Sequence, residues 1–218
     1  MPGLPPAAAA AWLHIVDGLV RGLNHGLSNR VNTLNTLLAV LQDTRELDAE
    51  IEGALMGEEE RFEAMLRLFR LLPLEGARPN QPTALAGPVA DAVALFAHHL
   101  ELRMLPCRVV GLDAAPPVQS RQHTLTQVLL LVLVTVGRAI ADDDWAHGLV
   151  LQVTSAGNEV VIRASTALPT VAAADDTAWV ACEWMASTLG ATTRRGRDDT
   201  SHAWAELALP NVAVMDVR

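Results

Sequence analysis

The sequence contains no lysine, and its 16 basic residues are all arginines, against 25 acidic residues, which gives a net charge of −9. Proteins that bind nucleic acids need a basic surface to neutralise phosphates, so this balance argues against nucleic acid as a partner. The two cysteines, Cys107 and Cys182, are isolated and show no CxxC spacing. A cysteine metal site or a disulfide framework is therefore not expected, and a reducing cytoplasm fits the chain.

Signals for secretion and membrane insertion are also missing. The first residues, from Met1 to Ala7, carry no basic side chain, so a secretory signal is not expected. The longest apolar run, Val128 to Val134, is too short to span a bilayer. Half of the 218 residues are hydrophobic, which argues against disorder and allows one large or two small domains. We expect a free-standing cytoplasmic protein that needs no membrane.

Two long amphipathic segments open the chain, over about residues 8–42 and 49–72. In the first, apolar side chains recur at steps of three and four, the period of a helix with one apolar face. This seam consists of Val16, Val20, Leu23, Leu27, Val31, Leu34, Leu38 and Leu41. Asp48 is expected to cap the second helix. A hairpin of two such helices has no core of its own, so we predict that two copies pair into a dimeric four-helix bundle.

Residues 73–82 are rich in proline and glycine, which predicts a linker between two domains. The hairpin domain is assigned to residues 1–72 and the second domain to residues 83–218. In the second domain the pattern predicts three helices alternating with strands, the order of an α/β sandwich, so that the fold class is α+β. Its helices are expected over about 85–102, 123–140 and 176–189, and its strands over about 107–112, 148–154, 159–164, 191–195 and 202–209.

The first helix carries a polar stripe beside its apolar seam. Arg21, His25, Ser28, Asn29 and Asn32 lie on this stripe. A histidine at the centre of a polar stripe is displayed to solvent, and imidazole is a good nucleophile near neutral pH. The catalytic group is therefore expected to be His25, with Arg21 and Asn29 one turn away on either side. Arg21 can assist His25 by offsetting negative charge, or it can be an ordinary solvated arginine.

The segment His25-Gly-Leu-Ser-Asn29, followed by Val31 and Leu34, resembles the H-box of sensor histidine kinases. In that family the box histidine lies on the first helix of a dimeric helical hairpin and carries a phosphoryl group. An α/β ATP-binding domain of the GHKL type follows the hairpin, in the same order of elements as here, so the resemblance covers nearly the whole chain. It implies that Asn29 contacts the imidazole or the phosphoryl oxygens.

The second domain departs from the family at the residues that bind nucleotide. Leu131 and Thr135 stand at the positions of two asparagines, one of which helps to hold Mg²⁺, and Ala164 stands where the adenine-reading aspartate is expected. The box near 172–182, which the family fills with glycines, contains none. Glycine is what lets backbone amides approach phosphates closely. The resemblance therefore implies a degenerate domain, and no cofactor is expected on this chain; an α/β domain unrelated to kinases is the alternative.

The H-box departs as well, because Gly26 occupies the position that is acidic in most of the family, where the acid serves as the base for autophosphorylation. Accepting a phosphoryl group from a phospho-aspartate is easier, since the donor is activated and the receiver domain supplies Mg²⁺. This combination resembles bacterial histidine phosphotransferases derived from kinase cores, which act in two-component phosphorelays. The partners implied are response regulator receiver domains, with a hybrid histidine kinase as a further candidate.

Gly18, Gly22 and Gly26 form a stripe along the first helix, and each costs about 1 kcal/mol relative to alanine. Either a partner approaches closely beside His25, or the helix packs tightly within the fold; both explanations stay open. The predicted partner-binding residues are Gly22, Gly26, Ser28 and Asn32. The run from Glu58 to Glu60 is expected to be a solvated face.

Two other functions compete with phosphotransfer. One is a non-enzymatic dimeric pseudo-kinase scaffold, which binds or sequesters a response regulator or a kinase without becoming phosphorylated. The other is an active kinase, which requires binding of Mg²⁺-ATP by the second domain. Phosphorylation of His25 separates the first of these from phosphotransfer, and nucleotide binding separates the second.

Overall fold

The structure, a computed structural model, describes residues 5–44, 48–76, 78–140, 146–170 and 176–212. The helices are α1 (Pro6–Thr44), α2 (Ala49–Phe69), α3 (Ala86–Phe96), α4 (Gln122–Gly137) and α5 (Asp176–Thr188). The strands are β1 (Gln81–Thr83), β2 (Cys107–Val110), β3 (Val118–Ser120), β4 (Leu149–Ala156), β5 (Glu159–Thr166), β6 (Thr192–Arg197) and β7 (Ala203–Pro210). The predicted elements of the second domain occur in the expected order, and the structure adds two short strands that were not predicted, β1 and β3, which pair with each other.

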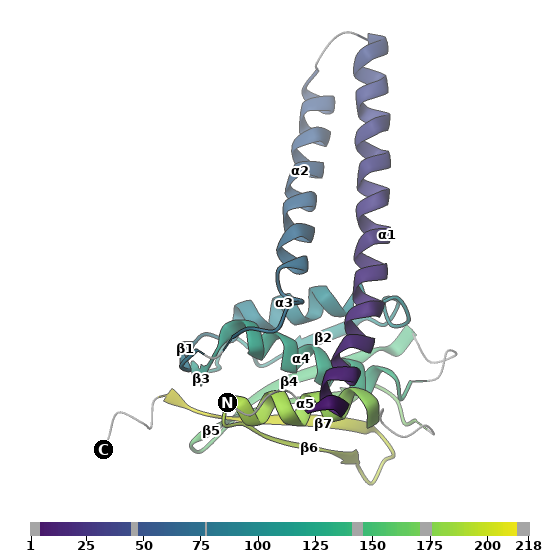
Figure 1. The fold of residues 1–218 in the computed structure, drawn as a ribbon. Helices are drawn as coiled ribbons and strands as arrows, with labels where there is room; N and C mark the ends of the chain where they lie inside the picture. Colours follow the sequence, from purple (N-terminus) through teal and green to yellow (C-terminus); the bar gives the residue numbers. More distant parts are fainter. Residues whose placement is uncertain (1–4, 45–47, 77, 141–145, 171–175, 213–218) are drawn as a thin grey trace.

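Helices α1 and α2 form the predicted antiparallel hairpin, which projects from the rest of the molecule (Figure 1). Asp48 caps α2 as predicted, because its carboxylate accepts a hydrogen bond from the amide of Ile51 at 2.8 Å. Within the described residues, no helix is long and apolar enough to cross a membrane. Pairing of two hairpins into a four-helix bundle stays a prediction.

The second domain is a five-stranded sheet in the order β2-β4-β5-β7-β6, with α3, α4 and α5 packed together over it (Figure 1). Strands β2 and β4 run parallel, and the remaining neighbours pair antiparallel. Side chains along β5 alternate between buried and less buried positions, as expected for a sheet covered by helices on one face. The predicted fold class, a helical hairpin followed by an α/β sandwich, is confirmed.

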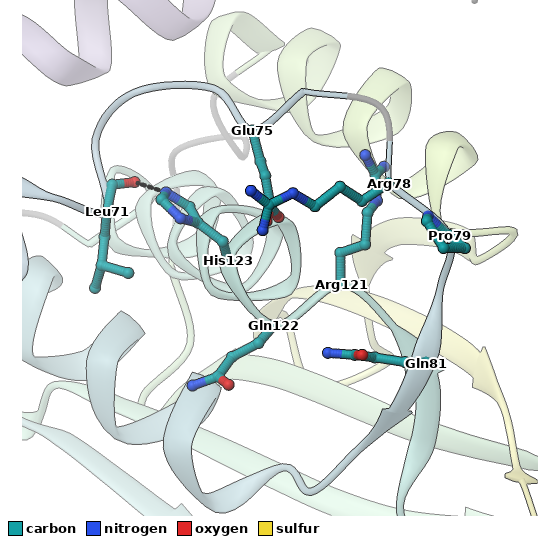
Figure 2. Close-up of a pocket in the computed structure, with 8 residues that line it drawn as sticks. All are labelled: Leu71, Glu75, Arg78, Pro79, Gln81, Arg121, Gln122 and His123. Carbon is teal, nitrogen blue, oxygen red and sulfur yellow. Dashed lines mark hydrogen bonds and ion pairs between the residues drawn. The ribbon is translucent and has the colours of Figure 1, made fainter.

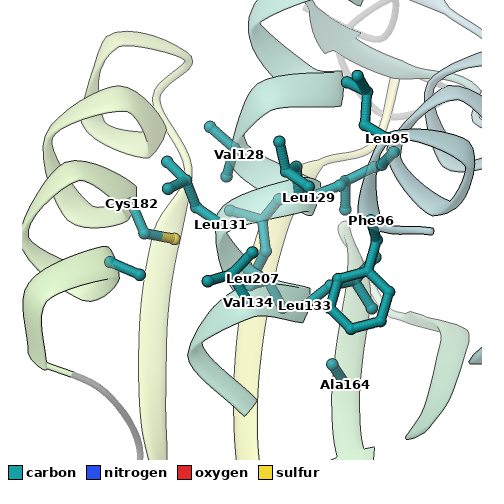
Figure 3. Packing of buried hydrophobic residues seen from close by; sticks show 14 of the residues in the cluster. Leu95, Phe96, Val128, Leu129, Leu131, Leu133, Val134, Ala164, Cys182 and Leu207 are labelled. Carbon is teal, nitrogen blue, oxygen red and sulfur yellow. The ribbon is translucent and has the colours of Figure 1, made fainter. Parts of the chain in front are cut away.

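Helix α4 is the centre of the core. Every residue from Thr124 to Gly137 is buried, because α3 and α5 flank the helix and the sheet closes it from a third side. Figure 3 shows its leucines and valines between Phe96 of α3, Cys182 of α5 and Leu207 of β7. A helix that is apolar all round is expected to be buried in this way.

The N-terminal half of α1 belongs to this same core. Trp12, Ile15, Leu19 and Leu23 are buried in one cluster with residues of the second domain, and α1 lies against α5 as well as α2. Of these four residues only Leu23 belongs to the predicted seam, so the N-terminal half of α1 buries a face that the seam omitted. The sequence assigned the whole apolar face of α1 to the hairpin and its dimer, whereas part of it packs on the second domain. An apolar stripe identifies the buried face of a helix, but it does not identify the element that covers that face.

Candidate functional site

His25 lies in the middle of α1, and its side chain is exposed to solvent. Its Nε2 atom lies 3.5 Å from the Nδ2 atom of Asn29, one helical turn further on, so the two residues expected to act together are neighbours. In the part of the chain that the structure describes, no carboxylate forms an ion pair or hydrogen bond with His25. The imidazole is thus accessible and has an amide as its neighbour, without an adjacent acidic group.

The other residues of the polar stripe have different surroundings. Arg21 forms an exposed ion pair with Asp17 at 2.9 Å, on the side of His25 toward the N-terminus. Ser28 donates its hydroxyl hydrogen to the carbonyl of Asn24 at 2.9 Å, and Asn32 is exposed. The roles of Arg21 in catalysis, and of Ser28 and Asn32 in partner binding, stay predictions.

A buried carboxylate fixes the rotation of α1 against α2. Glu58 of α2 is only 3% exposed, and it accepts hydrogen bonds from Arg30 of α1, at 3.1 Å, and from Arg61 of its own helix. The expectation that Glu58 is part of a solvated face is therefore wrong, because two arginines neutralise it between the helices. Successive helical residues are about 100° apart, so His25 points about 140° away from Arg30 and hence away from α2.

The glycine stripe packs against the segment that follows α3. A Cβ atom on Gly22 would come within 1.7 Å of the carbonyl oxygen of His98, and a Cβ on Gly18 within 3.1 Å of Nε2 of His99. A Cβ on Gly26 would lie 2.8 Å from Cε of Met65, a flexible side chain of α2. The structure therefore gives these glycines a packing role within the chain. Contact of Gly22 and Gly26 with a partner stays a prediction.

His99 is buried beside Gly18, and neither of its ring nitrogens has a hydrogen-bond partner within the described structure. Burial, together with the nearby charge of Arg138, lowers the pKa of His99 to about 4. This histidine is therefore held neutral at the contact between α1 and the second domain. The sequence offered no signal for it, since His98 and His99 form no metal-ligand or catalytic spacing.

The segment after α3 also carries exposed apolar side chains, and its first part lies against α1. The amide nitrogen of Leu100 lies 3.6 Å from the position of a Cβ on Gly22, and the side chains of Leu100 and Met104 are exposed, Met104 by 66%. Sequence reasoning missed this surface, because only the docking of His98 on Gly22 brings residues 98–100 to the same helix as His25.

The positions that the resemblance to histidine kinases assigns to nucleotide-binding residues are packed into the core. Leu131 and Thr135 are completely buried, and the Thr135 hydroxyl donates to the carbonyl of Leu131 at 2.7 Å, within the same helix. Ala164 is completely buried too (Figure 3). These side chains present no carboxylate or amide to a base or a metal ion. Of the segment near 172–182, residues 172–175 lie outside the described residues; among the described residues, no cluster of His, Cys, Asp and Glu suits a metal ion.

Comparison with protein-family models and with curated proteins found no match. Among solved structures, the chain is similar to a histidine kinase from Burkholderia phymatum STM815, with 14% identity, a TM-score of 0.49, and coverage of 95% of this chain and 99% of that one. The Acinetobacter baumannii histidine kinase AdeS has 15% identity and a TM-score of 0.47, and the match covers 86% of this chain and 98% of that one. A bacterial phosphotransferase has 10% identity and a TM-score of 0.45, and the match covers 89% of this chain and 96% of that one. At these identities the likeness concerns the fold alone.

Proposed function

We propose that this chain is a phosphorelay histidine phosphotransferase that passes a phosphoryl group between receiver domains through His25. The lone pair of a ring nitrogen of His25 attacks the phosphorus of a receiver's phospho-aspartate. The bond between phosphorus and the carboxylate oxygen breaks, and the aspartate leaves as its carboxylate. The reverse step on a second receiver restores free His25. The receiver supplies the Mg²⁺ that offsets the phosphoryl charge, and Arg21 assists from one turn away.

The observation that carries this proposal is the setting of His25. The imidazole is exposed and points away from α2, and Asn29 is placed to orient it. Gly26 directly follows His25, at the position where an autokinase needs an acidic residue. Within the part of the chain that the structure describes, no carboxylate pairs with His25. Such a histidine suits an already activated donor, because the donor's leaving group is a stable carboxylate and needs no general base on the acceptor helix.

Core packing argues against ATP as the donor. A nucleotide needs polar side chains at the positions that Leu131, Thr135 and Ala164 occupy. Leu131 and Ala164 are apolar, and the hydroxyl of Thr135 is already bonded within its own helix. Binding of ATP there would leave its polar groups unpaired in a packed interior, at a cost of about 1–3 kcal/mol for each group. The residues present therefore do not fit a nucleotide, and no step of the proposed mechanism uses one.

A receiver that reaches His25 also meets the second domain. Gly22 holds residues 98–100 against α1, and Leu100 and Met104 are exposed within and just after this segment; we propose that they form one combined surface with Ser28 and Asn32. We infer that this combined surface binds the receiver, and that the second domain has become a fixed docking element. The hairpin is proposed to pair with a second copy, because Val31, Leu38 and Met56 are exposed apolar side chains on its two helices.

The experiment that tests the function is a relay between two purified receiver domains, one carrying labelled phosphate. Label should reach the second receiver when the wild-type chain is added and ATP is absent, and His25→Gln should stop it. If Met104→Asp abolishes receiver binding while the wild type binds receivers and never becomes labelled, the alternative of a non-enzymatic scaffold replaces phosphotransfer. The exposed Leu100 and Met104 are the observation that favours this alternative.

A further inference from the structure

A second polar site lies at the start of α4, away from His25. Residues 71–76 and 78–81, together with the first turn of α4, line an open cavity of about 500 Å³. Its lining includes Glu75, Arg78, Arg121, Gln122 and His123. Figure 2 shows the Arg78 side chain extending over the cavity toward Glu75 and His123. Arg121, the residue directly before α4, extends its side chain upward in the same view. Neither Arg78 nor Arg121 has a role in the function proposed above.

The start of α4 is suited to an anion. Arg121 occupies the N-cap position without a side-chain capping bond, and the first turn contains no acidic residue. The first amide of the helix to bond within it is that of Leu125, which donates to the carbonyl of Arg121 at 2.8 Å. The amides before Leu125 therefore lack an intrahelical acceptor, and the helix dipole places positive potential at this end.

A buried, incompletely paired arginine provides independent evidence for a ligand. Arg121 is only 6% exposed; one end of its guanidinium donates to the hydroxyl of Thr188 at 2.6 Å, whereas its buried Nε atom has no partner within the described structure. One carboxylate oxygen of Glu75 is buried and unpaired in the same way. Buried polar groups are nearly always paired, so two unpaired atoms on residues that both line the cavity indicate a group bound at this site.

The cavity continues inward as a smaller one of about 50 Å³, which Glu75, Arg121 and Gln127 line. That space has room for only a water molecule or two, which suffices for the unpaired oxygen of Gln127. The outer cavity is far larger and opens to solvent, and its walls are fixed. His123 and Gln127 both bond to the carbonyl of Leu71, at 2.9 and 2.8 Å, and hold residues 71–73 against α4.

We propose that this cavity binds a small hydroxylated phosphate monoester. Its phosphate would lie between the guanidinium groups of Arg121 and Arg78 and the uncapped amides of α4. Three sets of donors from different directions suit a tetrahedral group with three terminal oxygens better than a flat carboxylate. The ion pair between Arg78 and Glu75 is long, 3.5 Å, and Arg78 is exposed, so the phosphate can replace it. Glu75 then accepts a hydrogen bond from a hydroxyl group of the ligand.

The test is calorimetric titration of the whole chain with glycerol 3-phosphate, inorganic phosphate and glycerol. Glycerol 3-phosphate should bind saturably, inorganic phosphate more weakly, and glycerol not at all. Arg78→Gln should weaken the binding of glycerol 3-phosphate about tenfold, the loss expected for one charge-assisted hydrogen bond. Arg103→Gln is the matched control, because Arg103 is an exposed arginine outside the cavity, and it should leave binding unchanged.

Arg121→Gln should weaken binding further, and circular dichroism will show whether this buried substitution folds; if it does not, Arg78→Gln decides. Absence of saturable binding by both phosphate probes overturns the proposal, as does equal affinity in the wild type and Arg78→Gln. Equal affinity for glycerol 3-phosphate and inorganic phosphate overturns the role of Glu75. The proposal does not depend on phosphotransfer at His25, which these titrations leave untouched.

Discussion

The carbonyl oxygen of His98 lies so close to Gly22 that a Cβ atom at position 22 would approach it to 1.7 Å. This contact joins the helix that carries His25 to the end of α3. It lies one helical turn from His25, so it sets where the second domain stands relative to the imidazole. A backbone oxygen cannot move aside as a flexible side chain does, and the contact requires glycine at position 22.

Gly22→Ala should therefore destabilise the protein by about 1–3 kcal/mol, because the added methyl group forces α1 and α3 apart. Urea unfolding measures the loss. Gly53→Ala is the control: a Cβ on Gly53 of α2 would meet nothing within 4 Å, so this change should stabilise the protein by about 1 kcal/mol through helix propensity. A Gly22→Ala variant as stable as the wild type would contradict the contact.

The buried carboxylate of Glu58 leads to a second prediction. Glu58→Gln should lower the free energy of unfolding by about 1–3 kcal/mol, because Arg30 and Arg61 lose their charged acceptor between the helices. Glu59→Gln changes an exposed neighbour and should have an effect within about 0.5 kcal/mol. Equal effects of the two substitutions in thermal or urea unfolding would show that Glu58 is not the link between α1 and α2.

The elements of this fold follow closely from hydrophobic periodicity, whereas their contacts do not. Helix α1 was expected over 8–42 and spans Pro6–Thr44, and the strand pair expected at 148–154 and 159–164 spans Leu149–Ala156 and Glu159–Thr166. By contrast, Ile15 and Leu19 lie outside the predicted seam, and their docking on the second domain has no local signal, because an apolar helix face can pack against any apolar partner. Burial of Glu58 likewise depends on Arg30, which is distant in the sequence.

In the candidate site, too, local features could be predicted from the sequence, whereas contacts between distant segments could not. The spacing from His25 to Asn29 is local, one turn of a helix, and the sequence was enough to predict that the two side chains are neighbours. Exposed Leu100 and Met104, and the cavity lined by Arg78 and Arg121, arise only when distant segments meet. Periodicity in a single sequence carries no information about such encounters, so these surfaces required the structure.

The stability of the protein should fall in mild acid because of His99. Burial lowers its pKa in the folded state to about 4, whereas the ordinary value is 6.5. Between these values the unfolded chain binds a proton that the folded chain does not, so stability is full above pH 6.5 and falls as the pH approaches 4. The loss reaches about 3 kcal/mol.

Urea unfolding at several pH values measures this dependence in the wild type and in His99→Gln, which should flatten the curve between pH 6.5 and 4. His147→Gln alters an exposed histidine and should retain the wild-type dependence. An unchanged curve for His99→Gln would assign the acid sensitivity to other groups, among them Glu101 and His14, which interact with His99.

The hairpin should be an obligate homodimer. Leu38 is 46% exposed on α1, and burying it and its apolar neighbours against a second copy removes a surface that rarely stays in water. Sedimentation should show a dimer for the wild type and for Met104→Asp, and a monomer for Leu38→Asp. Leu34→Asp, at a half-buried position, should disrupt the dimer and the fold together. A stable, folded wild-type monomer at micromolar concentration would refute dimerisation.

The central claim is that His25 accepts a phosphoryl group from a receiver and not from ATP. The most direct measurement incubates the whole chain either with a receiver carrying labelled phospho-aspartate or with labelled Mg²⁺-ATP, and then locates the label by acid lability and peptide mass spectrometry. The account predicts an acid-labile phosphohistidine at His25 from the receiver alone, absent in His25→Gln and retained in His14→Gln, which changes another histidine of α1. Label acquired from ATP, or label that persists in His25→Gln, would contradict it.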